Sequence, residues 1–207
     1  MRTTGGGALA AAVMVLREVR WSSAVEDGTR SSPFYEEAGS TTGVVNDALR
    51  GCGIGNCVST SNSAGSPEDY GPPWRAPEGM TPARAAEAIV ACFAESGDAM
   101  LTAYRSYTVR GQGDEGRNSK YLRFSAKGLW GDDIIEFLIS DDQVLDRNWE
   151  GDRAGCIVTY ASRGAVKFLY PLTQPLSDFG LQKKRLSTLR QRLNWQIVGC
   201  ELIECYQ

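Results

Sequence analysis

Four runs of strand-like sequence in the second half of the chain place the strongest constraint on the fold. Turns rich in Gly, Asp and Asn, such as 111–114 and 131–132, join them. These turns are too short to hold crossover helices, so neighbouring strands should pair antiparallel. In the third run apolar side chains occupy both alternating faces, which predicts a central strand covered on each side. The four expected strands are residues 101–109, 120–126, 133–139 and 156–161.

Two helices are expected to pack on this sheet. The first begins with Thr81 as N-cap and Pro82 in its first turn, shows one apolar face, and stops at Gly97. The second starts near Ser177 or Asp178. It turns Leu186, Leu189 and Leu193 inward and carries its cations outward, at Lys183, Lys184, Arg185, Arg190 and Arg192. We expect these cations to pair with the acidic loop after the third strand, with anion or partner binding as the alternative.

These elements predict an α+β fold, in which two principal helices pack on a mainly antiparallel sheet of four or five strands. The tail 195–206 is a candidate for a final edge strand. We divide the 207 residues into an irregular N-terminal arm, 1–50, and a single α+β domain, 51–207. Within the domain, the proline-rich stretch 61–81 should run extended over the surface, with Tyr70 and Trp74 fixing it to the core.

The arm contains an apolar run, residues 8–16, flanked by arginines. Nine residues are too few to span a bilayer as a helix, but they match the apolar region of a signal peptide. We therefore favour a targeting segment or a membrane-proximal anchor over a short surface helix.

The composition argues against catalysis. The chain has no histidine, which excludes Ser/His and Cys/His nucleophile pairs and His-ligated zinc or haem within it. Ser59 and Ser162 therefore have no histidine partner. The glycine-rich stretch 51–55 lacks the preceding strand and following helix of a phosphate-binding loop, and a net charge of -3 predicts no general attraction to nucleic acid. We expect no enzyme activity, no cofactor, no metal and no nucleic-acid partner.

Six cysteines include two pairs with four intervening residues: Cys52 with Cys57, and Cys200 with Cys205. This spacing differs from the two-residue spacing typical of zinc ribbons and redox motifs. Disulfides and free thiols are both consistent with these pairs, and a disulfide would imply an oxidising compartment. The other two cysteines, at 92 and 156, lie in apolar sequence and are expected to be buried thiols.

Charged residues gather around the third strand and the second helix. We expect a structural network in which Asp132 closes a turn, Asp178 caps the helix and Arg163 ties the two together. The alternatives are an anion site, a hard-cation site, or a cleft where two carboxylates do acid–base work. The candidate network comprises Arg163, Asp178, Asp132, Asp133, Glu136 and Arg185.

The order of several motifs resembles the family called domain of unknown function 1499. The motifs are 56–60 followed by the proline-rich stretch, then 130–137, 160–163, 176–180 and 183–185. They extend from about Cys57 to Trp195. The segment 164–175 is longer than in the bacterial form and resembles the plant and algal members. The resemblance implies a chloroplast location, associated with the thylakoid membrane on its lumenal side, and no settled activity.

From these features we expect a non-enzymatic accessory protein that docks on a membrane-bound assembly. The resemblance implies that this assembly is a photosynthetic complex, a photosystem or its antenna, with peripheral association of the chain at the membrane. Aromatic anchors suit docking, and the candidates are Trp21, Trp74 and Tyr70. The alternative is a protein that binds a small molecule or an anion, or an enzyme, with Arg163 in a pocket between the sheet and its helices.

Overall fold

The computed structural model describes residues 42–45, 47–53, 55–62, 67–110, 116–141, 155–168 and 176–198. All of them belong to the unit Ser32–Gln207. Several predictions lie outside the described residues: the apolar run 8–16, the acidic loop after the third strand, Trp21, and the cysteine pair of Cys200 and Cys205.

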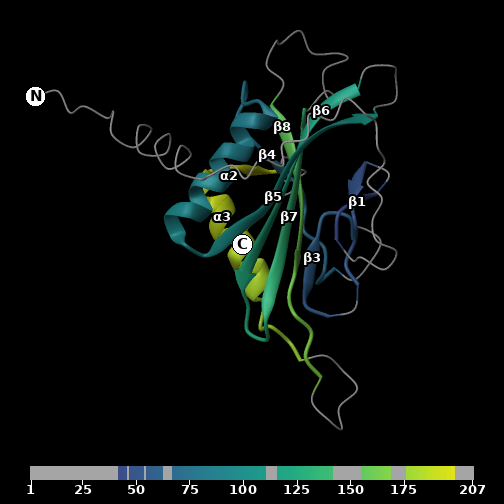
Figure 1. Cartoon of the computed structure of the whole chain (residues 1–207), viewed down its shortest axis with the longest axis vertical. Coiled ribbons are helices and arrows are strands. Elements are labelled where there is room, and N and C mark those ends of the chain that lie inside the picture. Colours follow the sequence, from purple (N-terminus) through teal and green to yellow (C-terminus); the bar gives the residue numbers. More distant parts are fainter. Residues whose placement is uncertain are drawn as a thin grey trace, which may run out of the picture. The chain divides into compact units, whose positions relative to one another are not determined.

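A seven-stranded, mainly antiparallel sheet forms the centre of the fold (Figure 1). Its strands follow the order β5-β6-β7-β8-β4-β9, and β3 pairs with the other end of β8. The long strands correspond to the four predicted runs: β5 (Ala99–Arg110), β6 (Gly116–Lys127), β7 (Asp132–Asp141) and β8 (Cys156–Arg163). The short strands are β3 (Cys57–Ser59), β4 (Trp74–Arg75) and β9 (Gln196–Ile197). The α+β prediction is confirmed, and three strands of two or three residues bring the sheet to seven.

Both helices cover one face of this sheet (Figure 1). The first, α2 (Pro82–Ser96), begins as predicted: the hydroxyl of Thr81 accepts a hydrogen bond from the Arg84 amide at 3.4 Å. Its Phe93 ring packs on Phe124 of β6, with 4.6 Å between ring centroids. The second helix, α3 (Leu181–Leu193), begins three residues after Asp178 rather than at it.

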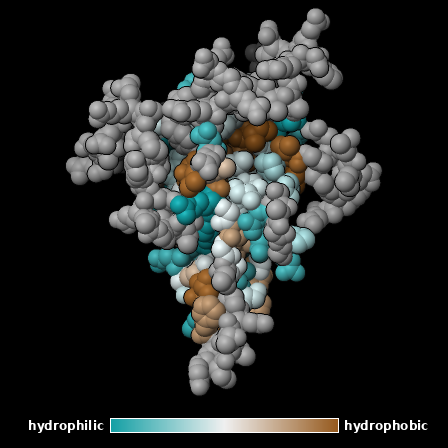
Figure 2. Space-filling view, turned by 90° about the vertical axis from the view of Figure 1, so that its right-hand side faces the viewer, coloured by the Kyte–Doolittle hydropathy of each residue, from teal (hydrophilic) through white to brown (hydrophobic). Residues whose placement is uncertain are grey.

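A separate two-stranded sheet covers the other face. Its strands β1 (Val44–Val45) and β2 (Ala48–Leu49) form a hairpin over β7 and β8. Leu49 is 2% exposed and packs in a small cluster with Tyr121, Leu138 and Ala161. Residues 42–50 therefore belong to the folded domain and not to an irregular arm. Figure 2 views the molecule from the side on which β1 lies, where the coloured surface is mixed, with separate hydrophobic patches.

β7 is the central strand that the sequence predicts. Ile135, Phe137 and Ile139 face the helices and are 0% exposed, whereas Glu136 and Leu138 face the hairpin. Alternate side chains of a strand point to opposite faces. Apolar cover on both faces explains why this strand shows little apolar–polar alternation.

The proline-rich segment is fixed to the core through Trp74. This side chain is buried, and its ring lies 4.6 Å from that of Tyr160, centroid to centroid. The Tyr160 hydroxyl donates a hydrogen bond to the Pro72 carbonyl at 3.0 Å. Tyr70 is half-buried and forms a bridge with Ser59. The predicted attachment of this segment is confirmed.

Candidate functional site

The predicted charge network splits into two separate sites on opposite faces of β7. Glu136 and Asp133 are three residues apart, so their side chains leave the strand in opposite directions. Glu136 faces the β1–β2 hairpin, and Asp133 faces α3. No single cleft can use both carboxylates.

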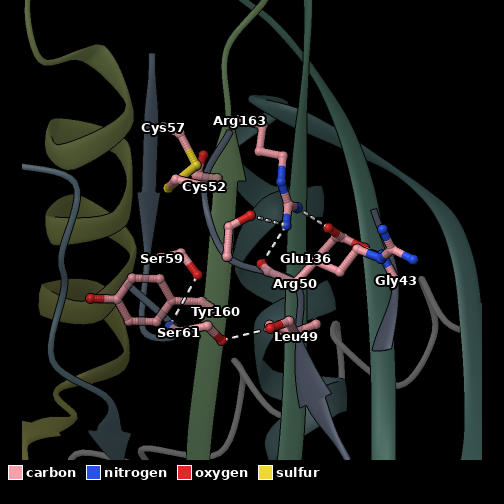
Figure 3. A network of polar contacts seen from close by, with 12 residues as sticks. Gly43, Leu49, Arg50, Cys52, Cys57, Ser59, Ser61, Glu136, Tyr160 and Arg163 are labelled. Carbon is pink, nitrogen blue, oxygen red and sulfur yellow. Dashed lines mark hydrogen bonds and ion pairs between the residues drawn. A yellow bond between two sulfur atoms is a disulfide. The ribbon is translucent and has the colours of Figure 1, made fainter. Parts of the chain in front are cut away.

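Glu136 forms the first site, shown in Figure 3. Its Oε1 accepts a hydrogen bond from the Gly43 amide at 2.6 Å. It accepts a second from the Tyr121 hydroxyl at 2.5 Å. Arg163 from β8 pairs with Oε2 and also donates to the Arg50 carbonyl at 2.5 Å. The Glu136 side chain is 0% exposed and that of Arg163 is 10% exposed. The pair is neutral overall and closed to solvent on the carboxylate side.

Tyr121 keeps its proton in this environment. Burial raises the pKa of Tyr121 far above its usual range, and the charge of Glu136 and its hydrogen bond raise it further. Arg123 and Arg163 oppose this pKa shift with smaller effects. The phenol is therefore a fixed hydrogen-bond donor to Glu136 at neutral pH.

Asp133 forms the second site. It is buried and accepts hydrogen bonds from Gln182 at 2.8 Å, Arg185 at 2.9 Å and the Ala165 amide at 3.2 Å. Ser162 of β8 donates to the side-chain oxygen of Gln182 at 2.5 Å. These contacts attach α3 to β7 and to the segment that follows β8.

The remaining two carboxylates act locally. Asp132 pairs at 2.6 Å with Lys127 across the β6–β7 turn, where the two side chains are 58% and 91% exposed, so this pair adds little stability. Asp178 accepts hydrogen bonds from the amides of Gly180 and Gln182 at 3.0 and 3.3 Å. It therefore satisfies an amide in the first turn of α3, although the N-cap residue itself is Gly180.

The prediction that Arg163 joins Asp132 to Asp178 is wrong. Arg163 lies opposite Ile134 in the β7–β8 register, which places it on the same face as Glu136 and away from the helices. Arg185 of α3 is the arginine that reaches a carboxylate on the helix face, at Asp133.

A disulfide joins Cys52 to Cys57, one of the two states that the sequence leaves open for this pair. Cys57 is the strand partner of Arg163 at the start of β3, so the bridge closes a short loop beside the Glu136 site. The structure does not test the second candidate disulfide. Cys200 and Cys205 lie outside the described residues, so a disulfide between them stays a prediction.

The other two cysteines, Cys92 and Cys156, are buried and form no disulfide, as expected. Burial raises the pKa of the Cys92 thiol, and a hydrogen bond with Arg192 partly opposes this. At neutral pH the thiol therefore stays protonated, which suits a packing role for Cys92.

Of the three aromatic residues predicted for docking, Trp21 lies outside the described residues, and neither Trp74 nor Tyr70 is fully exposed. Trp74 is 2% exposed because it fills the core between Tyr160 and Trp195, so its assignment as a docking residue is wrong. Tyr70 is only partly accessible.

Exposed apolar side chains lie instead at positions that the sequence analysis did not name as docking residues. Phe179 is 84% exposed, Phe168 55%, Leu129 52% and Val166 42%. For two of these residues, Leu129 and Phe179, the neighbouring glycines in the sequence indicate an exposed turn. Leu129 stands in a turn between Gly128 and Gly131, and Phe179 immediately precedes Gly180, whereas most core apolar residues lie within strands and helices.

A shallow groove of about 390 Å³ lies between α2 and α3. Its lining includes Phe93 and Leu189 with Lys184 and Arg192 at the surface. Arg163 does not line it, because Arg163 lies on the opposite face of the sheet. A pocket between sheet and helices that uses Arg163 is therefore not present in the part of the chain that the structure describes.

The described residues bring together no group of three or more His, Cys, Asp or Glu side chains that could hold a metal ion. None of the helices in these residues is both long enough and apolar enough to cross a membrane. The chain matches no protein-family model, no curated protein and no solved structure.

Proposed function

We propose that this chain is a non-enzymatic accessory protein that docks on a membrane-bound assembly. The observation that carries the proposal is that Phe179, Phe168, Leu129 and Val166, all more than 40% exposed, lie on three segments that hydrogen bonds bring together. Grouped apolar surface of this kind marks a contact with another molecule or with a membrane. Such surface has a reason to persist only if something covers it in the cell.

The internal pairing of the charged residues supports a role without catalysis. A general acid or base must reach a substrate, but the side chains of Glu136 and Asp133 are 0% and 2% exposed and each is paired with an arginine. The two serines are also engaged within the fold: Ser162 donates to Gln182, and the buried Ser59 accepts from the Ser61 amide. Both carboxylates hold segments of the fold in place.

The proposed subcellular location rests on the resemblance to domain of unknown function 1499. We propose a thylakoid location on the lumenal side, with a photosystem or its antenna as the assembly. The disulfide between Cys52 and Cys57 suits an oxidising compartment.

Native-gel separation tests the proposed function. Membranes of the source organism are extracted with a mild detergent, and the chain is located in the gel by mass spectrometry. We expect it to migrate with a large pigment or electron-transfer complex. Migration of the full-length chain entirely as a free monomer without pigment would contradict the proposal.

A further inference from the structure

We propose that the exposed apolar end of the fold enters the interfacial region of a lipid bilayer that carries anionic headgroups. This inference deepens the proposed function, because it names the surface that the docking region contacts. We call the region the apolar tip and define it as Leu129, Trp130, Val166, Phe168 and Phe179.

Three segments of the chain meet at the apolar tip. They are the β6–β7 turn, the segment after β8 and the segment before α3. The Trp130 indole N–H donates to the Ser177 carbonyl at 3.2 Å, and the Leu176 amide donates to the Lys167 carbonyl at 2.8 Å. In Figure 1 these segments lie at the lower end of the sheet, and one hydrophobic patch of Figure 2 lies toward that end. The tip is thus a single surface held together by hydrogen bonds.

Phe179 is the most exposed member of the tip and has a strained backbone. Its φ is 55°, in the left-handed region that bulky residues rarely adopt. The side chain is 84% exposed, so packing within the described fold does not compensate for this conformation. Glycine or asparagine would suit the backbone better. A phenylalanine held in this way indicates a role outside the fold.

Trp130 and Lys167 form an arrangement suited to a membrane interface. The Lys167 ammonium lies 5.3 Å from the centroid of the Trp130 ring, and the indole N–H already has a carbonyl partner. Tryptophan concentrates at the boundary between headgroups and acyl chains, and lysine extends its ammonium toward the headgroups. The pair provides an apolar ring and a cation at the same point.

The charges around the tip favour an anionic surface. Lys183 and Lys184 in the first turn of α3 are exposed, and no described carboxylate lies within ion-pair distance of either. The two acidic side chains nearest in sequence are engaged: Asp132 with Lys127, and Asp178 with backbone amides. A lysine near an anionic leaflet strengthens binding to it through charge attraction.

The position of the tip residues favours lipid over a protein groove as the partner. The apolar side chains stand on separate turns, and none of them lines either of the two grooves described between α2 and α3. Apolar residues on turns, with cations beside them, can enter a fluid interface without a matching partner surface. A protein partner would have to supply a complementary hollow.

Vesicle binding by the purified full-length chain tests this inference. Sedimentation is compared for vesicles of phosphatidylcholine alone and of phosphatidylcholine mixed with phosphatidylglycerol. We expect binding about tenfold tighter to the mixed vesicles. Phe179→Asn should weaken that binding about tenfold without lowering the melting temperature, because asparagine tolerates the left-handed backbone. Val45→Thr, at a residue 40% exposed in the β1–β2 hairpin, is the matched control and should bind as the wild type does.

All three proteins carry the same N-terminal arm, so a difference between them reports on the tip. Equal binding by the wild type and Phe179→Asn overturns the inference, as does absence of binding to both kinds of vesicle. In a second measurement, bromine-labelled acyl chains should quench tryptophan fluorescence, and Trp130→Phe should remove most of that quenching. Quenching that is unchanged in Trp130→Phe also overturns it.

The inference and the proposed function can fail separately. If the chain migrates with the membrane complex but binds no vesicle, the proposed function stands and the lipid contact is excluded. The tip would then contact a protein. If the chain binds vesicles through Phe179 but migrates as a free monomer after extraction, the lipid contact stands and the proposed assembly is excluded.

Discussion

At the scale of single residues, the buried pair of Glu136 and Arg163 serves the fold. Removing two charges from water is costly, and their mutual attraction offsets that cost only when further hydrogen bonds complete the site. Here Gly43, Tyr121 and the Arg50 carbonyl supply three such hydrogen bonds, although the buried Arg163 Nε has no hydrogen-bond partner among the described residues. The pair therefore joins four parts of the molecule: β6, β7, β8 and the residues that flank the β1–β2 hairpin.

Arg163→Ala should reduce the free energy of unfolding by about 3–5 kcal/mol, because it leaves the Glu136 charge buried and unpaired. The double variant that combines Arg163→Met with Glu136→Gln should recover much of this loss, since glutamine still accepts from Gly43 and Tyr121 and no charge remains inside. Urea unfolding of Arg163→Ala and of the double variant measures the difference. A change below about 0.5 kcal/mol in Arg163→Ala would contradict the structural role and reopen Arg163 as a ligand-binding group.

At the scale of elements, β7 and the turn before it connect the two faces of the sheet. Gly128 in the β6–β7 turn donates its amide to the Gly131 carbonyl at 2.8 Å. A Cβ at Gly128 would lie 2.1 Å from a carboxylate oxygen of Asp133. That carboxylate has little freedom to move, because Arg185, Gln182 and the Ala165 amide all bind it. The absence of a side chain at Gly128 is a packing requirement.

Gly128→Ala should therefore lower the free energy of unfolding by about 1–3 kcal/mol, the usual range for overpacking. Gly53→Ala is the matched control, since a Cβ added at Gly53 would meet nothing within 4 Å, and it should change stability by less than about 0.5 kcal/mol. Thermal and urea unfolding compare the two variants. Equal stability of both would show that Asp133 can leave its three partners at little cost.

The sequence predicts a helix or strand well when its apolar pattern extends over many residues, and poorly when the element is very short. α2 repeats its apolar spacing from Ala85 to Phe93, and β7 carries a nearly continuous apolar run from Ile134 to Ile139. The predicted start of each agrees with the structure to within one residue. β3, β4 and β9 have two or three residues each, too few to show a period. β3 and β4 form because the long strand β8 offers them a free edge, and β9 forms on the free edge of β4. The partner of Arg163 depends on the β7–β8 register, which the sequence does not determine.

At the scale of the whole molecule, the boundary of the folded domain lies earlier than the predicted division at residue 50. The hairpin of β1 and β2 covers the second face of the sheet, where the Leu49 side chain is buried. Gly43 and Arg50, on either side of the hairpin, bind the two members of the buried ion pair. The hairpin completes the core on that face and also shields Glu136.

Two truncations test this boundary. Removal of residues 1–50 should lower the free energy of unfolding by at least about 3 kcal/mol more than removal of residues 1–41. The longer truncation deletes the buried Leu49 side chain, the Gly43 amide and the Arg50 carbonyl, and a leucine removed from a core alone costs about 2–5 kcal/mol. Leu49→Ala in the full chain is the control, and it should account for part of the difference, since it leaves both backbone hydrogen bonds in place. If urea unfolding gives the two truncated chains equal stability, the hairpin adds nothing to the fold and the Glu136–Arg163 pair holds without it. The predicted 1–50 arm would then be correct as a structural division, and docking could be studied on residues 51–207 alone.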